Sequence, residues 1–255
     1  MVDTHCHLSR CADSPEAVLG RAAGAGLSRL LTVGLDEQSN REQIALAEAF
    51  ESVFVAIGRH PNDADGFDEA AADDIRMLAG HDRVRAIGET GLDFYRDTAE
   101  PESQRRAFAA QIRIADETGL PLVIHLRDRQ GSDEAAAETF RTLDNAGVDL
   151  TVILHCFSVP ERMTEAVERG WYCSFAGNVT YPANEALRIT AAGVPDELIL
   201  VETDSPYLSP QSKRRERNEP ANVVETATLV AGLRDTSLEE FDRIVSENSC
   251  RLFGW

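Results

Sequence analysis

Short runs of apolar and β-branched residues recur along the whole chain, separated by longer amphipathic stretches. Most of these runs are continuously apolar instead of alternating, which is typical of parallel strands covered on both faces. Eight of them are predicted strands, at residues 2–7, 29–34, 53–58, 84–89, 122–126, 151–156, 171–175 and 198–203. The pattern therefore predicts an α/β protein with a parallel sheet.

The stretches between these runs have helical spacing, and the tail adds two more helices. The predicted helices lie at residues 15–25, 38–50, 101–118, 132–146, 160–169, 223–233 and 238–253. Eight strands alternating with helices predict a single (β/α)₈ barrel of the TIM type over residues 1–255, with extra C-terminal helices. An open doubly wound sheet is the alternative, but it needs a glycine-rich first turn. The first turn here, Thr4-His5-Cys6-His7, contains no glycine.

The composition is strongly acidic, with 44 Asp and Glu against 25 Lys and Arg and a net charge of -19. Lys213 is the only lysine. One interpretation is a protein that avoids polyanions altogether. The interpretation we favour is a cytosol of molar salt, where an acidic, lysine-poor surface stays hydrated and salt screens its self-repulsion. On this hypothesis of a halophilic source, the acidic surface says little about the substrate.

Cysteine usage and hydropathy indicate the compartment. The five cysteines are an odd number without paired spacing, which favours free thiols in a reducing compartment. No apolar run has the length needed to cross a bilayer, and no signal-type segment precedes the first strand. We therefore expect a cytoplasmic protein with no membrane association. Because small acidic barrels can work alone, we also expect a monomer.

Histidines and carboxylates gather where the predicted strands end. His5 and His7 share one face of the first strand, since side chains alternate with period two. Five of the six histidines lie at such ends, and His81 is expected to be a solvated turn residue. In a barrel these ends meet at one rim, where active sites are built. The strand-end residues are His5, His7, His60, Glu89, His125, His155 and Asp204.

These side chains are sufficient for two divalent metal ions, with Mg²⁺, Mn²⁺ or Zn²⁺ as candidates. Mixed imidazole and carboxylate ligands suit Zn²⁺ and Mn²⁺ and tolerate Mg²⁺ less naturally. Because the fourth strand contains no lysine that could be carboxylated, Glu89 must bridge the ions. The predicted ligands are His5, His7 and Asp204 for one ion, and His125 and His155 for the other. Such a pair favours hydrolysis of a phosphoester or an amide.

Several segments resemble the TatD-type family of metal-dependent deoxyribonucleases, in order and from end to end. They are Asp3-Thr4-His5-Cys6-His7-Leu8, Gly58-Arg59-His60-Pro61, Ile87-Gly88-Glu89-Thr90-Gly91-Leu92-Asp93-Phe94-Tyr95, Leu154-His155-Cys156-Phe157-Ser158, Glu202-Thr203-Asp204-Ser205-Pro206-Tyr207-Leu208, Arg217-Asn218-Glu219-Pro220 and the tail at residues 247–253. The resemblance implies the barrel, the metal pair and nuclease-type hydrolysis. Val159 replaces the family's usual glycine, and Arg129 replaces a small residue.

The expected reaction is hydrolysis of DNA from its 3′ end, with no organic cofactor. Asp204 is predicted to orient and deprotonate a metal-activated water, and Glu89 to bridge the ions. Arg127 is on the same face as His125 and is placed to grip a phosphate. Arg59 and His60 are weaker candidates for the same contact, against a surface arginine and a loop-packing histidine.

Two further residues and one segment are assigned with their alternatives. Glu202 is expected to orient a metal ligand or to be a structural carboxylate. Tyr207 either stacks on a terminal base or faces the core, the latter being favoured. The run at residues 213–217 is the only dense positive patch, and is either a nucleic-acid contact or a solvated loop.

Two rival functions remain open from the sequence. The first is an ester or amide hydrolase on the same barrel, acting on a small molecule or removing an acyl group from tRNA, because substrate loops vary most on barrels. The second is a metal-binding protein without catalysis, which the full ligand set with Asp204 disfavours.

Overall fold

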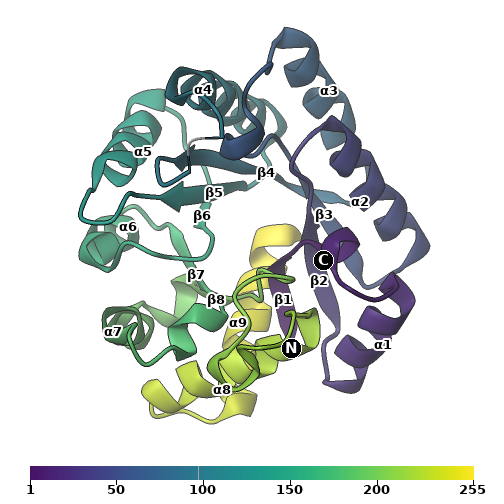
Figure 1. Cartoon of the computed structure of the whole chain (residues 1–255), viewed down its shortest axis with the longest axis vertical. Helices are drawn as coiled ribbons and strands as arrows, with labels where there is room; N and C mark the ends of the chain where they lie inside the picture. Colours follow the sequence, from purple (N-terminus) through teal and green to yellow (C-terminus); the bar gives the residue numbers. More distant parts are fainter. Residues whose placement is uncertain (97) are drawn as a thin grey trace.

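The computed structural model describes residues 1–96 and 98–255. Its strands form one parallel sheet in chain order, with helices around the outside (Figure 1). The strands are β1 (Val2–Cys6), β2 (Arg29–Val33), β3 (Val53–Ile57), β4 (Val84–Asp93), β5 (Leu122–Arg127), β6 (Val152–Leu154), β7 (Tyr172–Phe175) and β8 (Ile199–Val201). Each predicted strand is present.

The last strand meets the first, which closes the sheet into a barrel. Cys6 forms a parallel bridge with Ser205. The backbone N–H of His7 donates to the Ser205 carbonyl over 2.7 Å, and that of Asp204 to the His5 carbonyl over 2.9 Å. This closure confirms the TIM-type (β/α)₈ barrel, and the open doubly wound alternative is wrong.

The outer layer contains every predicted helix, together with two that the sequence pattern did not single out, α3 and α7. The helices are α1 (Pro15–Gly24), α2 (Glu37–Ala49), α3 (Glu69–Ala79), α4 (Pro101–Thr118), α5 (Glu134–Ala146), α6 (Met163–Glu168), α7 (Glu185–Gly193), α8 (Val223–Leu233) and α9 (Leu238–Phe253). The first turn of the predicted helix at 160–169 is a separate 3₁₀ turn, η3 (Pro160–Arg162). No helix in the described part of the chain has both the length and the apolar content to cross a bilayer.

Two apolar layers fill the molecule, one between sheet and helices and one inside the barrel. Inside, alternate residues such as Leu31 and Val33 of β2 pack with Val123 of β5, and Phe253 and Trp255 pack against this cluster. His125 follows Val123 by two residues, so it points to the same inner face. The barrel interior is therefore apolar at its base and polar towards its carboxyl-terminal end.

Strand boundaries differ from the predicted ones where the site residues lie. β4 extends four residues beyond Glu89 to Asp93, whereas β6 and β8 end at Leu154 and Val201. His155 and Asp204 consequently lie just beyond the strand ladders. Asp204 has a φ of 53°, in the left-handed region that Asp tolerates better than most residues.

Candidate active site

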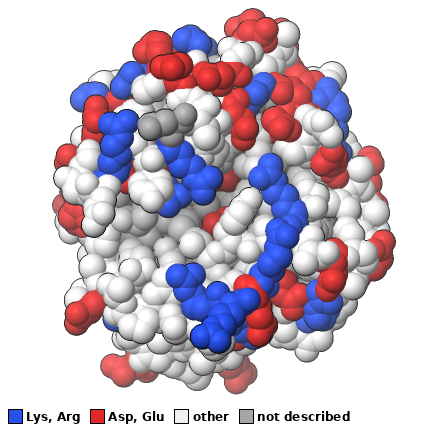
Figure 2. Space-filling view, viewed as in Figure 1, with Lys and Arg blue, Asp and Glu red and all other residues white. Residues whose placement is uncertain are grey.

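A cavity of about 640 Å³ opens at the carboxyl-terminal end of the barrel. Figure 2 shows this face of the molecule, hollowed at its centre. The predicted residues that line the cavity are His7, His60, Glu89, His125, Arg127, His155, Asp204 and Tyr207. His5 lies just beneath, with its side chain fully buried. The barrel thus brings together residues that are far apart in the chain.

Glu89 is placed by two glycines that let β4 and β5 approach closely. Gly88 and Gly91 have φ values of 139° and 136°, a region that favours glycine. A Cβ atom on Gly91 would lie 2.1 Å from the His125 carbonyl oxygen. The β4–β5 register shifts between Ile87 and Thr90, around Glu89. The Glu89 side chain is buried at the centre of the site.

The two oxygens of Glu89 face different histidines. Oε2 lies 3.4 Å from Nε2 of His5 and 3.8 Å from Nε2 of His7. Oε1 lies 2.6 Å from Nδ1 of His125 and 2.9 Å from Nε2 of His155. Burial alone would raise the pKa of Glu89, but the neighbouring histidines hold that pKa well below its usual range. Glu89 is therefore an anion, with one oxygen for each pair of histidines.

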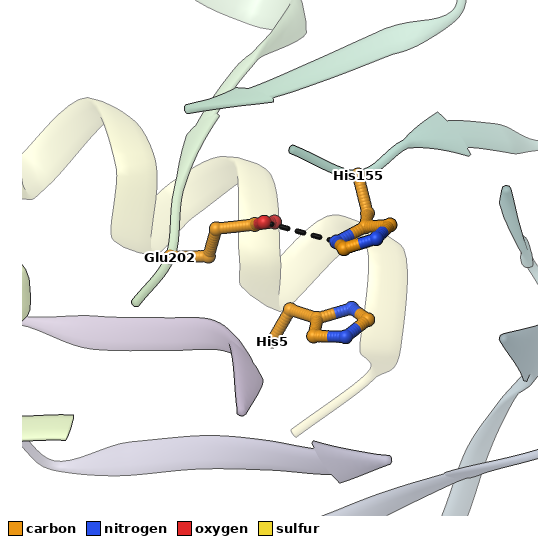
Figure 3. Close-up of side chains that lie close together, drawn as sticks. All are labelled: His5, His155 and Glu202. Atoms are coloured by element: carbon orange, nitrogen blue, oxygen red, sulfur yellow. Dashed lines mark hydrogen bonds and ion pairs between the residues drawn. The ribbon is translucent and has the colours of Figure 1, made fainter. Parts of the chain in front are cut away.

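His5 shows that this cluster fits a metal ion. Its side chain is fully buried, and neither ring nitrogen hydrogen-bonds to a residue that the structure describes. Its ring stacks on that of His155 with 3.9 Å between centroids (Figure 3). Burial and the nearby His155 lower the pKa of His5, so its imidazole is neutral. Buried polar atoms without partners are costly, and a neutral imidazole is a good ligand for a divalent metal ion.

Glu202 fixes the orientation of His155 from behind. It is fully buried, and its Oε1 accepts hydrogen bonds from Nδ1 of His155 over 3.0 Å and from the Cys156 N–H over 2.9 Å (Figure 3). Nε2 of His155 is thereby directed at Glu89. Carboxylates in this position set the tautomer of a ligating histidine. Glu202 therefore orients His155, whose role as a metal ligand stays a prediction.

Asp93 orients His125 in the same way, a role that the sequence pattern did not indicate. Its Oδ2 lies 3.2 Å from Nε2 of His125 and accepts a hydrogen bond from Nδ2 of Asn62. Burial would raise the pKa of Asp93, but His125 lowers it to about 2. The signal was available, since Glu89, Gly91 and Asp93 share one strand face at period two. The prediction ended the strand at Glu89 and so missed it.

Asp204 completes the cluster on the side of β1. Its Oδ1 lies 3.5 Å from Nε2 of His7 and 3.9 Å from Nε2 of His5. The other nitrogen of His7, Nδ1, faces the Val33 carbonyl over 3.2 Å, so Nε2 is free to act as a ligand. Burial raises the pKa of Asp204, but the three neighbouring histidines outweigh it and lower that pKa. Asp204 is therefore ionised at neutral pH.

His60 enters the site as a hydrogen-bond donor. Its Nδ1 accepts the Asn62 N–H over 3.0 Å, which leaves the proton of the neutral ring on Nε2. That Nε2 faces Oε1 of Glu89 over 3.4 Å. Burial lowers the pKa of His60, which favours the neutral form. This tautomer is suited to contact an anion and not to bind a cation.

The remaining predicted contacts divide between the rim and the surface. The Arg127 guanidinium lies 4.1 Å from the centroid of the Tyr95 ring and lines the cavity. Tyr207 is 46% exposed, with its ring edge-on to His7, so the core-facing interpretation is wrong. Arg59 does not line the cavity. Its guanidinium pairs with Glu37 and donates to the Asp63 carbonyl, so it is not placed to hold a phosphate.

The remaining histidine, the departure at Val159 and the neighbouring residue Asp128 lie outside the metal-type cluster. His81 lies in the bend before β4, with its ring beside Glu48. Val159 adopts a φ of -121°, which needs no glycine. Asp128 accepts the N–H groups of Ala135 and Ala136 at the start of α5.

Comparison with known proteins gives the family. The model of the TatD-related DNases matches residues 2–254. The chain belongs to this family. It is 39% identical to the uncharacterized metal-dependent hydrolase TatD of Mycobacterium tuberculosis, over all of this chain and 98% of that protein. It is 34% identical to the 3'-5' ssDNA/RNA exonuclease TatD of Dickeya dadantii, over 93% of this chain and 91% of that protein.

The crystal structure of YJJV, a TatD homologue from Escherichia coli, has the same fold. It superposes with a TM-score of 0.89 at 25% identity and covers all of this chain and 98% of its own. The phosphotriesterase homology protein of E. coli, at 16% identity and a TM-score of 0.68, shares the fold alone. The predicted family and enzyme class are therefore confirmed, and this TatD-family protein is a metal-dependent hydrolase of ester bonds.

Proposed function

We propose that this protein removes nucleotides from the 3′ end of single-stranded DNA by hydrolysing phosphodiester bonds, using two divalent metal ions. The observation that carries the proposal is the placement of Glu89. Each of its oxygens faces its own pair of histidines, one pair from β1 and one from the ends of β5 and β6. This is the arrangement expected of a carboxylate that bridges two metal ions.

We assign His5, His7 and Asp204 to one ion and His125 and His155 to the other. When bound, the two ions supply Lewis-acid polarisation of the phosphate and promote ionisation of the attacking water. The donor set suits Zn²⁺ or Mn²⁺ and also admits Mg²⁺. His5 supports the first position, since neither of its nitrogens forms a hydrogen bond with a described residue.

The protein's own groups perform the remaining steps. Asp204 is ionised, lines the cavity and accepts the proton of the attacking water at a carboxylate oxygen. Arg127 makes no ion pair within residues 1–96 and 98–255, so its charge is available for the non-bridging oxygens of the phosphate. His60 donates a hydrogen bond from its Nε2–H group to the same anion. Tyr207, half-exposed at the rim, provides a face for the terminal base.

Nucleic acid is favoured as substrate by the relatives and by the rim. The Dickeya dadantii relative carries the name of a 3'-5' ssDNA/RNA exonuclease. The cavity is lined by three arginines, Arg10, Arg96 and Arg127. The half-exposed Tyr207 lies beside them in the lining. Cationic and aromatic side chains around a metal-type site suit a strand of phosphates and unpaired bases.

The test is a cleavage assay on metal-stripped protein in high KCl. Single-stranded DNA labelled at either end is supplied with Mg²⁺, Mn²⁺ or Zn²⁺ singly, using Glu89→Ala and the matched control His81→Ala. We expect metal-dependent shortening of the 5′-labelled strand and early release of the 3′ label, lost in Glu89→Ala and retained in His81→Ala. Intact DNA with every metal, from folded and metal-loaded protein, would overturn the proposal and direct the search to acyl and amide substrates.

A further inference from the structure

Positive charge gathers around the cavity of a protein whose net charge is -19. In Figure 2, Lys and Arg side chains flank the central hollow on both sides. A loop at residues 207–218, which we call the basic loop, borders the cavity through Tyr207 and Leu208. It contains Lys213, Arg214, Arg215 and Arg217, with Glu216 as its one carboxylate.

No carboxylate in the described part of the chain forms an ion pair with the arginines of the basic loop. Lys213 is engaged, because its Nζ donates to Asn222 and lies 3.4 Å from Glu225. Arg214, Arg215 and Arg217 are exposed and form no ion pair with any carboxylate that the structure describes. In a chain with 44 carboxylates against 25 basic residues, this leaves a local excess of positive charge that an outside anion can fill.

Arg214 is held in a fixed position. Its guanidinium lies 4.0 Å from the centroid of the Tyr181 ring, and Nη1 donates to the Tyr181 hydroxyl over 3.1 Å. That hydroxyl donates in turn to the Ser209 carbonyl over 2.9 Å. A guanidinium stacked in this way loses little conformational freedom on binding a phosphate.

The basic loop is joined to the cavity at two points. Nη2 of Arg217 donates to the carbonyl of Arg10, whose own Nη1 donates to the hydroxyl of Tyr207. Both Arg10 and Tyr207 line the cavity. On the other side, Tyr181 directly follows η4 (Gly177–Thr180), from which Asn178 lines the cavity. A nucleic-acid strand that leaves the cavity past Tyr207, the first residue of the basic loop, therefore runs on towards the arginines of that loop.

We infer that the basic loop is a second contact for single-stranded nucleic acid, in which Arg214 and Arg215 hold backbone phosphates on the 5′ side of the bond that is cleaved. The inference rests on the proposed function, which places the 3′ end in the cavity. It predicts that long strands bind more tightly than dinucleotides and that the difference depends on salt.

The test compares Arg214→Ala/Arg215→Ala with the control Arg113→Ala/Arg141→Ala, which removes two exposed arginines from α4 and α5. The probe is fluorescent single-stranded DNA of about 20 nucleotides with uncleavable phosphorothioate links at its 3′ end. Its anisotropy is titrated with metal-loaded protein from about 0.1 to 0.5 M KCl. Circular dichroism in each buffer shows that every variant is folded.

Each phosphate contact on a single strand contributes about 0.7 to the slope of log affinity against log salt. Loss of two contacts therefore lowers the slope by about 1.4. Relative to about 1 M KCl, where this contribution to the affinity vanishes, binding at 0.1 M KCl becomes about 25-fold weaker. Hydrolysis of a thymidine dinucleotide should not change. An unchanged slope, or a slope that falls equally in the control, overturns the inference.

The outcomes separate this inference from the proposed function. Hydrolysis of DNA with an unaltered salt slope refutes the basic loop alone. A lowered slope in a protein that cleaves no DNA refutes the nuclease proposal and leaves the loop as a binding site. An equal loss of affinity for duplex DNA of the same length overturns the assignment to a single strand.

Discussion

Replacing Glu202 should weaken one metal position and leave the other intact. Glu202 does not line the cavity, and no hydrogen bond in the described part of the chain joins it to His5 or His7, although one of its oxygens lies within 4.8 Å of a His5 nitrogen. Among the described residues, its Oε1 accepts hydrogen bonds from His155 and from the backbone N–H of Cys156. Glu202→Gln retains the volume and one acceptor oxygen, and Glu202→Ala removes both. The two variants therefore separate the loss of charge from the loss of the hydrogen bonds.

The size of the effect follows from these two contacts. In Glu202→Ala, two buried donors lose their acceptor at about 1–3 kcal/mol each, so unfolding becomes easier by about 2–6 kcal/mol. The affinity of the position formed by His125 and His155 should fall by about 10- to 100-fold, since His155 is no longer held with Nε2 towards Glu89. Glu202→Gln should recover most of the stability and only part of the affinity.

Calorimetric titration of metal-stripped protein with Zn²⁺ measures both binding steps. The wild type should show two steps, and the variants should weaken one of them while the step assigned to His5, His7 and Asp204 keeps its affinity. Thermal unfolding in the same buffer reports the stability. Two unchanged steps, or two steps weakened equally, would refute the reasoning that Glu202 acts through His155.

Other predictions follow from the same geometry. Asp204→Asn should lower kcat for single-stranded DNA by about 10²- to 10⁴-fold in a gel assay, and activity near that of the wild type would rule out Asp204 as the base. Burial would lower the pKa of His125 and His155, but Asp93, Glu89 and Glu202 raise it, so both hold protons that the metal must displace. Between about pH 6 and 8, the affinity for Zn²⁺ should therefore rise by up to about tenfold per pH unit for each displaced proton. Calorimetry in buffers of different ionisation enthalpy measures the proton release. An affinity that does not change with pH would contradict this prediction. Gly91→Ala should lower the melting temperature and the metal affinity together, because its Cβ would meet the His125 carbonyl at 2.1 Å. The melting temperature should also rise steadily with KCl as salt screens the net charge of -19, and full stability at low salt would reject the halophilic hypothesis.

The barrel and the gathering of the site could be predicted because both depend on local pattern. Continuous apolar runs mark strands buried on both faces, and a parallel barrel places all strand ends at one rim. Knowing that His5, His125 and His155 end their strands was therefore enough to expect them together. The structure brings all three within reach of Glu89.

Properties that depend on side-chain direction beyond the strands could not be predicted. Arg59 adjoins His60 in the chain, yet it turns to Glu37 on α2, a partner that no spacing rule identifies. Tyr207, which was predicted to face the core, is exposed in the segment that follows β8. The tautomer of His60 depends on a single contact with the Asn62 backbone.

The central claim is that Glu89 bridges two metal ions. Its most direct test is the metal content of protein loaded with Zn²⁺ and freed of excess, measured by inductively coupled plasma mass spectrometry for the wild type and Glu89→Ala. The account predicts two ions per chain in the wild type and less than one in the variant. A single ion in the wild type, or two retained without Glu89, would contradict it.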